Sequence, residues 1–549
     1  MNSSEFLKKV NDELKDRDKK EILDIVNNLI RKIPKSKYDE VIYMLGNDDK
    51  LENIESKIEE YRTKFKMIDD LDLCFHATGY EDYDNYYWGD WIWEYSDDDN
   101  VGDLIKEATY YAVNLVNHKE YKYAKEMLDL IIYANYQFLD DDGGDFFEIS
   151  LKELQEECLI NINVYTICTY AIYATYQFST KSSRAKNIYD YFKNENFRDV
   201  SVEDAFKLGT EILTELDDFF TSWINLLIDK KDSIAYRLLK EALVYNNFNN
   251  YEKYIKDFAV NHPKIYLDIF DYLIKEERID EVIRVGNLAL SYLDKNLTIR
   301  NDILLFMAKY DSSNKEKYII ESFESNSTVA NLLRVINNSY YFKYKEKINK
   351  IISSNKGNTN SNKSSELNKN YVDKDTYSYL QFFLGNFEEF YNICLSNKKS
   401  LGWSYSFIKT AVYLWLLVLN NNISSILFLN ILEDIFVRLD VKDNTLFLDD
   451  SYSLIFNRWK DNFELLDKDK YLTWLEEVID KRVTAIVEGN HRKSYYKAAK
   501  LVVSLGEVME ANGITTKESF IEKYREKYSR RTAFKSELNK YKNLSDSLI

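Results

Sequence analysis

The chain has 549 residues, of which 45% are hydrophobic, 15% are aromatic and 30% are charged. A chain of this length exceeds one compact core, and its aromatic content excludes a mainly disordered protein. The formal net charge of −18 disfavours broad binding to nucleic acid or to anionic membranes, but it leaves room for a local basic surface. With only 2 prolines and 14 glycines, the chain has too few turn residues for a β-rich fold. We therefore expect an all-α protein with several domains or an extended helical repeat.

The cysteines and the apolar segments indicate where the protein resides. Cys74, Cys158, Cys168 and Cys394 are isolated, with no CxxC or disulfide-like spacing, which fits a reducing compartment. The first residues are polar and lack the apolar stretch of a secretory signal. The longest apolar run, Ala411–Leu419, is far shorter than the ~20 residues that cross a bilayer, and it predicts a buried core helix. We expect a cytoplasmic protein without membrane contact.

Residues 1–66 are predicted to form an N-terminal helical region, and residues 67–102 form what we call the acidic aromatic segment. Residues 67–103 carry twelve carboxylates and no Lys or Arg. Aromatic residues recur there at spacings of three and four, which predicts one face of a helix. This face either packs on neighbouring helices or docks a protein partner that has a basic segment. The helical stripe comprises Tyr80, Tyr83, Tyr87, Trp91 and Tyr95. The predicted partner contacts are Tyr80, Tyr86, Trp88, Trp91, Trp93, Asp97, Asp98 and Asp99.

Residues 103–354 are predicted to form a helical-repeat solenoid. At several helix junctions, an aromatic or aliphatic residue precedes a small or apolar residue by three positions, as where the second helix of a tetratricopeptide-like hairpin begins. No fixed period holds, so we expect an irregular α-solenoid of TPR- or HEAT-like hairpins. Asp140–Glu148 lacks the spacing of an EF-hand loop and predicts a cap and break between two helices, with adventitious metal binding as the alternative. The predicted helix starts are Tyr121 with Ala124, Ile279 with Val282, Phe387 with Phe390, and Tyr495 with Ala498.

Residues 355–371 are polar and low in complexity, which predicts a flexible linker before a C-terminal helical domain at residues 372–549. The alternative is an insertion between two adjacent helices of one continuous solenoid. We expect a protease to cut first within this segment. From residue 491 to the end, thirteen Lys or Arg face seven acids. This basic end is either a set of solvated helices or a nucleic-acid contact. The predicted contacts are Arg492, Lys493, Arg525, Arg530 and Arg531.

Four segments, taken together and in order, carry a family resemblance. Tyr121–Cys158 places a helical hairpin before LDDDGGDFFEIS, and Leu401–Leu419 sets Gly-Trp-Ser ahead of an apolar helix. His491–Leu505 puts a tyrosine pair and an alanine pair on one helix, and Arg530–Leu538 reads RRTAFKSEL. Over roughly residues 103 to 538, the chain resembles the helical region that follows the zinc finger in bacterial SWIM zinc-finger proteins. The resemblance implies a nucleic-acid-associated role as the alternative function and brings no enzymatic activity, and the contacts made by the family's zinc finger do not carry over.

The zinc finger of that family is missing from the chain. It requires CxC followed by CxH, because tetrahedral zinc takes four ligands. Only Cys74 and His76 resemble half of this motif, and no CxC precedes them. From spacing alone we expect structural roles for both residues, no stoichiometric zinc and no cofactor.

Catalytic signatures are also missing from the sequence. The sequence contains no HExxH motif, no P-loop motif and no GxSxG motif. We therefore expect a non-enzymatic helical-repeat interaction or scaffold protein, an accessory subunit of a larger bacterial assembly. The alternatives are a nucleic-acid-associated protein that acts through its basic C-terminal region, or an enzyme of unrecognised class.

Overall fold

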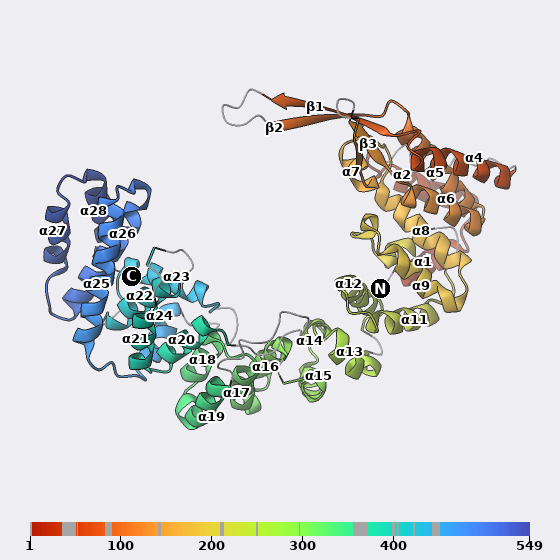
Figure 1. Ribbon diagram of the computed structural model, residues 1–549. Coiled ribbons are helices and arrows are strands. Elements are labelled where there is room, and N and C mark those ends of the chain that lie inside the picture. Colours follow the sequence, from red (N-terminus) through yellow and green to blue (C-terminus); the bar gives the residue numbers. More distant parts are fainter. Residues whose placement is uncertain are drawn as a thin grey trace. The chain divides into compact units, whose positions relative to one another are not determined.

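The computed structural model describes residues 3–35, 51, 53–82, 90–140, 144–208, 213–248, 251–295, 297–354, 372–397, 401–402, 406–420, 423–441 and 451–548. The chain divides into two compact units, Met1–Ile265 and Tyr266–Ile549. Helices make up most of both units (Figure 1), which confirms the helical fold expected from the scarcity of proline and glycine.

The first unit combines helices with a small sheet. Its helices are α1 Ser3–Leu14, α2 Lys19–Ile30, α4 Ile54–Asp69, α5 Val101–Asn117, α6 Tyr121–Tyr133, α7 Leu151–Glu156, α8 Val164–Phe178, α9 Lys181–Tyr191, η2 Glu195–Phe197, α10 Val202–Ala205, α11 Leu216–Ile228, α12 Ser233–Tyr245, η3 Tyr251–Tyr254 and α13 Ile255–Asn261. Its strands are β1 Phe75–Asp82, β2 Asp90–Ser96, β3 Gln137–Asp140 and β4 Phe146–Glu148.

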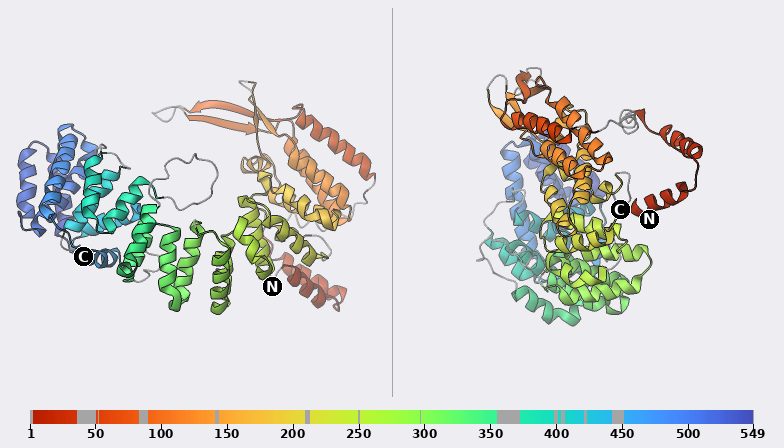
Figure 2. Two further views of the ribbon diagram at one scale, coloured as in Figure 1. Left: turned by 60° about the horizontal axis from the view of Figure 1, so that its bottom comes forward. Right: turned by 90° about the vertical axis from the view of Figure 1, so that its right-hand side faces the viewer.

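Within residues 67–102, Phe75–Asp82 and Asp90–Ser96 form strands β1 and β2 instead of one helical face, so the predicted helix is wrong for these residues. β1 and β2 pair antiparallel, with Trp93 opposite Gly79 and Tyr95 opposite Ala77. Figures 1 and 2 show this two-stranded ribbon extending away from the helices of its unit. The aromatic spacings of three and four ran across two strands and the chain between them, so they did not describe one helix. The alternation Trp91, Trp93, Tyr95 within β2 has the period of two that a strand requires.

The segment Asp140–Glu148 lies between α6 and α7, as expected of a break between two helices, but the end of strand β3 and strand β4 form within it. β3 and β4 pair antiparallel, and β3 also lies parallel to β1, giving the strand order β2-β1-β3-β4. The aromatic side chains build one face of this sheet. Tyr95 stacks on Phe138 at 4.4 Å between ring centroids, and Trp93 meets the edge of Phe147 at 6.1 Å. Aromatic pairs across strands stabilise a sheet and explain why so aromatic a segment pairs instead of coiling.

The second unit contains helices and one isolated β-bridge between Ser425 and Leu548 among its described residues. The helices are α14 Ile265–Lys275, α15 Ile279–Tyr292, α16 Thr298–Tyr310, η4 Ser312–Asn314, α17 Lys315–Ser325, α18 Val329–Asn337, α19 Tyr341–Ser354, α20 Lys374–Phe383, α21 Phe387–Ser396, α22 Phe407–Leu419, α23 Ile426–Arg438, α24 Tyr452–Lys460, α25 Lys468–Glu488, η5 Arg492–Ser494, α26 Tyr495–Ala511, α27 Lys517–Lys527 and α28 Thr532–Asp546.

The predicted helix starts agree with the structure. α6, α15, α21 and α26 begin at Tyr121, Ile279, Phe387 and Tyr495. The residue three positions later is fully buried in each case. Helices that follow one another in the chain pack together, including α5 with α6, α20 with α21, and α25 with α26. A small or apolar residue at the fourth position allows this close approach.

The apolar run at residues 411–419 lies in α22, where all its residues except Tyr413 are buried. Trp415 stacks on Tyr471 of α25 at 4.3 Å, so α22 is a core helix as predicted. Among the described helices, none combines the length and the apolar character that crossing a bilayer requires.

The predicted linker, residues 355–371, lies outside the described residues. The helices on its two sides pack against each other within the second unit: α18 contacts both α20 and α24. Asn337 donates a hydrogen bond to the carbonyl oxygen of Ile455 at 3.4 Å, and Tyr341 meets the ring of Phe463 at 5.5 Å. The described helices before and after this segment therefore share one core.

Candidate functional site

A pocket with a volume of about 170 Å³ opens among four helices of the second unit. We call it the basic pocket, because five of its six charged lining residues are cationic. The loop before α22 and helices α22, α23, α25 and α26 supply its residues. The lining residues are Leu401, Gly402, Lys409, Tyr413, Ile431, Asp434, Ile435, Arg438, Arg482, Tyr496, Lys497, Lys500 and Leu501.

Helical spacing places these side chains on the faces that meet at the pocket. Lys409 and Tyr413 are four residues apart on α22, and Lys497 and Lys500 are three residues apart on α26. Residues at these separations share one side of a helix. The opposite side of each helix is apolar and buried, as Trp415 on α22 illustrates. Burial of the apolar side therefore fixes the direction of the polar side.

The pocket holds five cationic side chains and one carboxylate. Lys500 Nζ pairs with Asp434 Oδ2 at 3.0 Å and lies 5.5 Å from the centroid of the Tyr413 ring. Within the part of the chain that the structure describes, no carboxylate lies within ion-pair distance of the other four cations. These four are Lys409, Arg438, Arg482 and Lys497.

The pKa shifts reflect this accumulation of positive charge. Burial lowers the pKa of Lys409, the neighbouring cations Arg438, Lys497 and Lys500 lower it further, and Asp434 acts in the opposite direction. Burial also lowers the pKa of the Arg482 guanidinium, which nevertheless stays charged. Burial raises the pKa of Tyr413 well above its usual value, so its hydroxyl remains a hydrogen-bond donor. An anion in the pocket would relieve the repulsion that disfavours protonated Lys409.

Gly402 lies directly against the guanidinium of Arg482. A Cβ at this position would stand 2.5 Å from Arg482 Nη1, well inside van der Waals contact. The absence of a side chain at residue 402 thus gives the guanidinium room at the wall of the pocket. The Gly-Trp-Ser sequence noted above therefore includes one residue that shapes the basic pocket.

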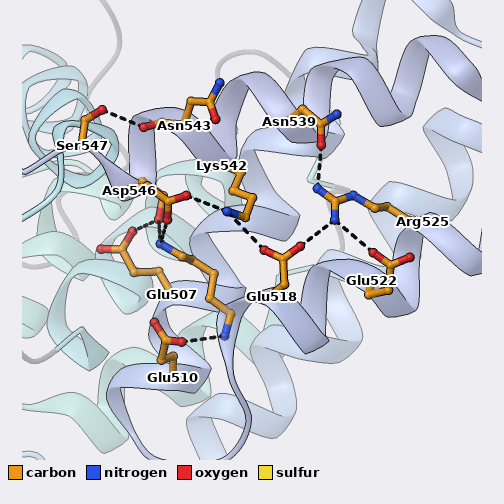
Figure 3. A network of polar contacts seen from close by, with 12 residues as sticks. Glu507, Glu510, Glu518, Glu522, Arg525, Asn539, Lys542, Asn543, Asp546 and Ser547 are labelled. Atoms are coloured by element: carbon orange, nitrogen blue, oxygen red, sulfur yellow. Dashed lines mark hydrogen bonds and ion pairs between the residues drawn. The ribbon is translucent and has the colours of Figure 1, made fainter.

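The predicted nucleic-acid residues lie elsewhere in the second unit. Arg525 pairs with Glu518 at 2.7 Å and with Glu522 at 3.0 Å, within the polar network of α26, α27 and α28 shown in Figure 3. Arg531 donates a hydrogen bond to Asn490 at 3.0 Å. The remaining three are exposed at the surface: Arg492, Lys493 and Arg530. Arg525 and Arg531 are thus engaged within the protein.

The predicted protein-contact residues lie on and after the sheet of the first unit. Tyr80 is in β1 and Trp91 in β2, whereas Tyr86 and Trp88 lie outside the described residues. Trp93 is 36% exposed at the edge of Phe147.

The three aspartates that follow this sheet differ in their surroundings. The Asp97 carboxylate accepts hydrogen bonds from the backbone N–H groups of Val101 and Gly102 in the first turn of α5. Asp99 accepts a hydrogen bond from the Cys74 backbone, and Asp98 is exposed. Two of the three carboxylates therefore have structural partners.

Sequence analysis did not identify the basic pocket. Only Lys497 and Lys500 belong to the basic end noticed in the sequence, and the other cations lie up to 88 residues earlier, at Lys409. Searches of protein-family models, curated proteins and solved structures found no match to the chain. The resemblance to SWIM zinc-finger proteins stays a prediction.

Proposed function

We propose that the protein is a non-enzymatic helical-repeat interaction protein that binds a phosphate group of a partner protein in the basic pocket. The observation that carries this proposal is the set of four cations without a carboxylate partner in one concavity. Arg438 is exposed and the other three cations are partly buried, so the four like charges repel one another in a partly open concavity. Such an arrangement is favoured where an anionic ligand supplies the missing charge.

The chemistry of the pocket favours phosphate over other anions. The two guanidinium groups can each present paired N–H donors to phosphate oxygens, and the lysines add compact charges. The pocket volume of about 170 Å³ lies below the roughly 300 to 1,000 Å³ of typical small-molecule pockets, which favours a group as small as one phosphate. The rest of the ligand must therefore lie outside, as a phosphorylated side chain on a peptide would place it.

The fold supports a protein partner. Successive helices pack as hairpins, and a solenoid of TPR- or HEAT-like hairpins, which we propose here, presents extended surfaces to protein segments. The net charge of −18 opposes a long polyanion, whereas a peptide with a single phosphate meets only local charge. A nucleic-acid partner is the alternative that the experiment must separate.

Binding of short phosphoserine and phosphothreonine peptides tests the proposal by calorimetry on the full chain. We expect phosphorylated peptides to bind at least about tenfold more tightly than the same peptides without phosphate, because charge-assisted hydrogen bonds contribute about 1.5 to 3 kcal/mol. Arg438→Gln should remove most of this preference. Lys481→Gln is the matched control, since Lys481 is exposed on α25 and does not line the pocket.

Two outcomes would contradict the proposal. Equal affinity for phosphorylated and unphosphorylated peptides would show that the pocket does not recognise phosphate. Tighter binding of a 5′-phosphorylated oligonucleotide, lost in Arg438→Gln and falling steeply with salt, would replace the protein partner with nucleic acid.

A further inference from the structure

Three potential metal ligands of different chemistry meet in the first unit, remote in sequence from the basic pocket. Cys74 immediately precedes β1, His76 is the second residue of β1, and Asp99 lies in the turn between β2 and α5. Because side chains two apart on an extended chain point to the same side, Cys74 and His76 face together. His76 is paired with Ser96 at the end of β2, so the turn that follows brings Asp99 back to them.

The distances place these groups around one point. Asp99 Oδ2 accepts a hydrogen bond from the Cys74 backbone N–H at 3.0 Å and lies 3.8 Å from His76 Nε2. One sulfur, one nitrogen and one oxygen ligand atom from the three residues all lie within 4.8 Å of one another. Ligand atoms around tetrahedral zinc are about 3.5 Å apart, so small side-chain rotations close the remaining gap.

We infer that Cys74, His76 and Asp99 form a transition-metal site that takes Zn²⁺. A thiolate, an imidazole and a carboxylate suit zinc, whereas Ca²⁺ and Mg²⁺ take oxygen ligands. Cys74 is buried, but the side chains of His76 and Asp99 are 19% and 34% exposed, which leaves a fourth position open to water. The metal joins the start of β1 to the turn that leads into α5.

The spacing of Cys74 and His76 alone predicted no zinc, because it offers two ligands and no CxC. The third ligand stands 25 residues downstream and is brought back by strand pairing. The hydrogen bond from the Cys74 backbone also orients the Asp99 carboxylate, as hydrogen bonds to metal-ligating side chains do in other metal sites. The site is independent of the basic pocket, so each proposal can fail without the other.

Cobalt titration of the metal-free full chain tests the site, since Co²⁺ bound to a thiolate gives a charge-transfer band in the near ultraviolet. We expect saturation at one Co²⁺ per chain and displacement by Zn²⁺. Asp99→Asn should weaken Co²⁺ binding at least about tenfold, because an amide oxygen can still accept from the Cys74 backbone but is a poor ligand. Cys158→Ser is the matched control, since Cys158 is an exposed cysteine outside the cluster and its loss should leave the band unchanged.

Further variants distinguish a loss of metal binding from a loss of folding. Cys74→Ser should abolish the thiolate band, with the helical circular dichroism as the check on folding. Should that variant fail to fold, His76→Gln and Asp99→Asn decide the matter, because both side chains are partly exposed. A missing thiolate band in the natural chain, a band that persists in a folded Cys74→Ser variant, or unchanged affinity in both other variants would overturn the site.

Discussion

The basic pocket and the polar network of Figure 3 use the same helix in opposite ways. Near its start, α26 directs Lys497 and Lys500 into the pocket, and near its end it carries Glu507 and Glu510 into the network. In the network, Lys542 pairs with Asp546 at 2.7 Å and with Glu518 at 3.2 Å. In the pocket, four of five cations have no such partner among the described residues. In the sequence, Lys497 and Lys500 of the pocket belong to the same basic end as the network, and only the arrangement of the acids separates them.

Two lysines make the difference measurable. Hydrogen bonds to Asp546 and Glu518 raise the pKa of Lys542. Burial and neighbouring cations lower the pKa of Lys409. Folding thus favours the charged form of Lys542 and disfavours that of Lys409. The network stabilises the packing of α26, α27 and α28. In the pocket, the cations repel one another, and a bound anion can offset this repulsion.

The largest effect is expected from Glu507→Ala at the centre of the polar contacts of α26. The Glu507 carboxylate accepts hydrogen bonds from Ser425 Oγ at 2.9 Å, from Asn420 Nδ2 at 3.2 Å and from Ser545 Oγ. Its removal leaves three partly buried donors without an acceptor, so we expect the free energy of unfolding to fall by roughly 2 to 3 kcal/mol. Urea unfolding measures this change.

Glu522→Ala provides the control for that variant. Glu522 is half exposed and pairs only with Arg525 among the contacts found, so its loss should cost less than about 1 kcal/mol. Equal losses in the two variants would show that Glu507 does not hold the helices together more than a surface charge does.

The next largest effect is expected from comparing Lys409→Met with Lys542→Met, which should change the free energy of unfolding in opposite directions. We expect Lys542→Met to lower the free energy of unfolding by up to about 1 kcal/mol, as partly exposed ion pairs do. Lys409→Met should raise it by about 0.5 to 1 kcal/mol, because it removes a desolvated and repelled charge. Thermal unfolding in a buffer without phosphate or sulfate provides the measurement.

The pH dependence follows the same signs. The stability that Lys542 contributes is present below its unfolded pKa and is lost as the pH rises through its raised folded pKa. Lys409 behaves oppositely. Once the pH passes its lowered folded pKa, this residue is protonated more often in the unfolded chain than in the folded chain. The free energy of unfolding therefore rises with pH in that range. If both variants shift stability in the same direction, the contrast between the two regions is wrong.

The helices were predictable because their signals are local. Apolar spacing and a polar turn suffice to place the start of α6 at Tyr121 and of α21 at Phe387. The sheet was missed because an aromatic count at intervals of three and four joined Tyr80 to Tyr95 across a strand connection. Strand pairing depends on contacts such as Tyr95 with Phe138, which are distant in the sequence.

The two sites could not be read from the sequence for a related reason. The basic pocket draws Lys409, Arg438 and Arg482 from three different helices, and each is surrounded in sequence by ordinary helical residues. Asp99 is one of twelve carboxylates within residues 67–103, and nothing local distinguishes it as a partner of Cys74. Convergence of side chains from separate elements is a property of packing, which no short pattern encodes.

A smaller effect is expected in the pH dependence of anion binding. Sulfate is a suitable probe because it remains a dianion over the whole range. As the pH rises from about 7 towards the ordinary lysine pKa of about 10.4, Lys409 loses its proton earlier than a lysine with the ordinary pKa, so sulfate affinity should fall severalfold. Lys409→Arg keeps the charge and should flatten this dependence in calorimetric titrations. A natural chain whose affinity does not change with pH would exclude Lys409 from the anion site.

The smallest effect concerns Gly402→Ala at the wall of the pocket. The backbone of Gly402 does not adopt a left-handed conformation, so alanine should not strain it, and the three atoms nearest to the new Cβ all belong to the end of the flexible Arg482 side chain. The free energy of unfolding should therefore stay within about 1 kcal/mol of the natural value. Displacement of the guanidinium should nevertheless weaken sulfate binding about three- to fivefold, which is about 1 kcal/mol or less. A double-mutant cycle with Arg482→Gln gives the decisive control, because the two residues are in contact and their effects should not add. Once Arg482 is removed, Gly402→Ala should cause no further loss. A full additional loss in the double variant would mean that Gly402 acts on the pocket by a route other than Arg482.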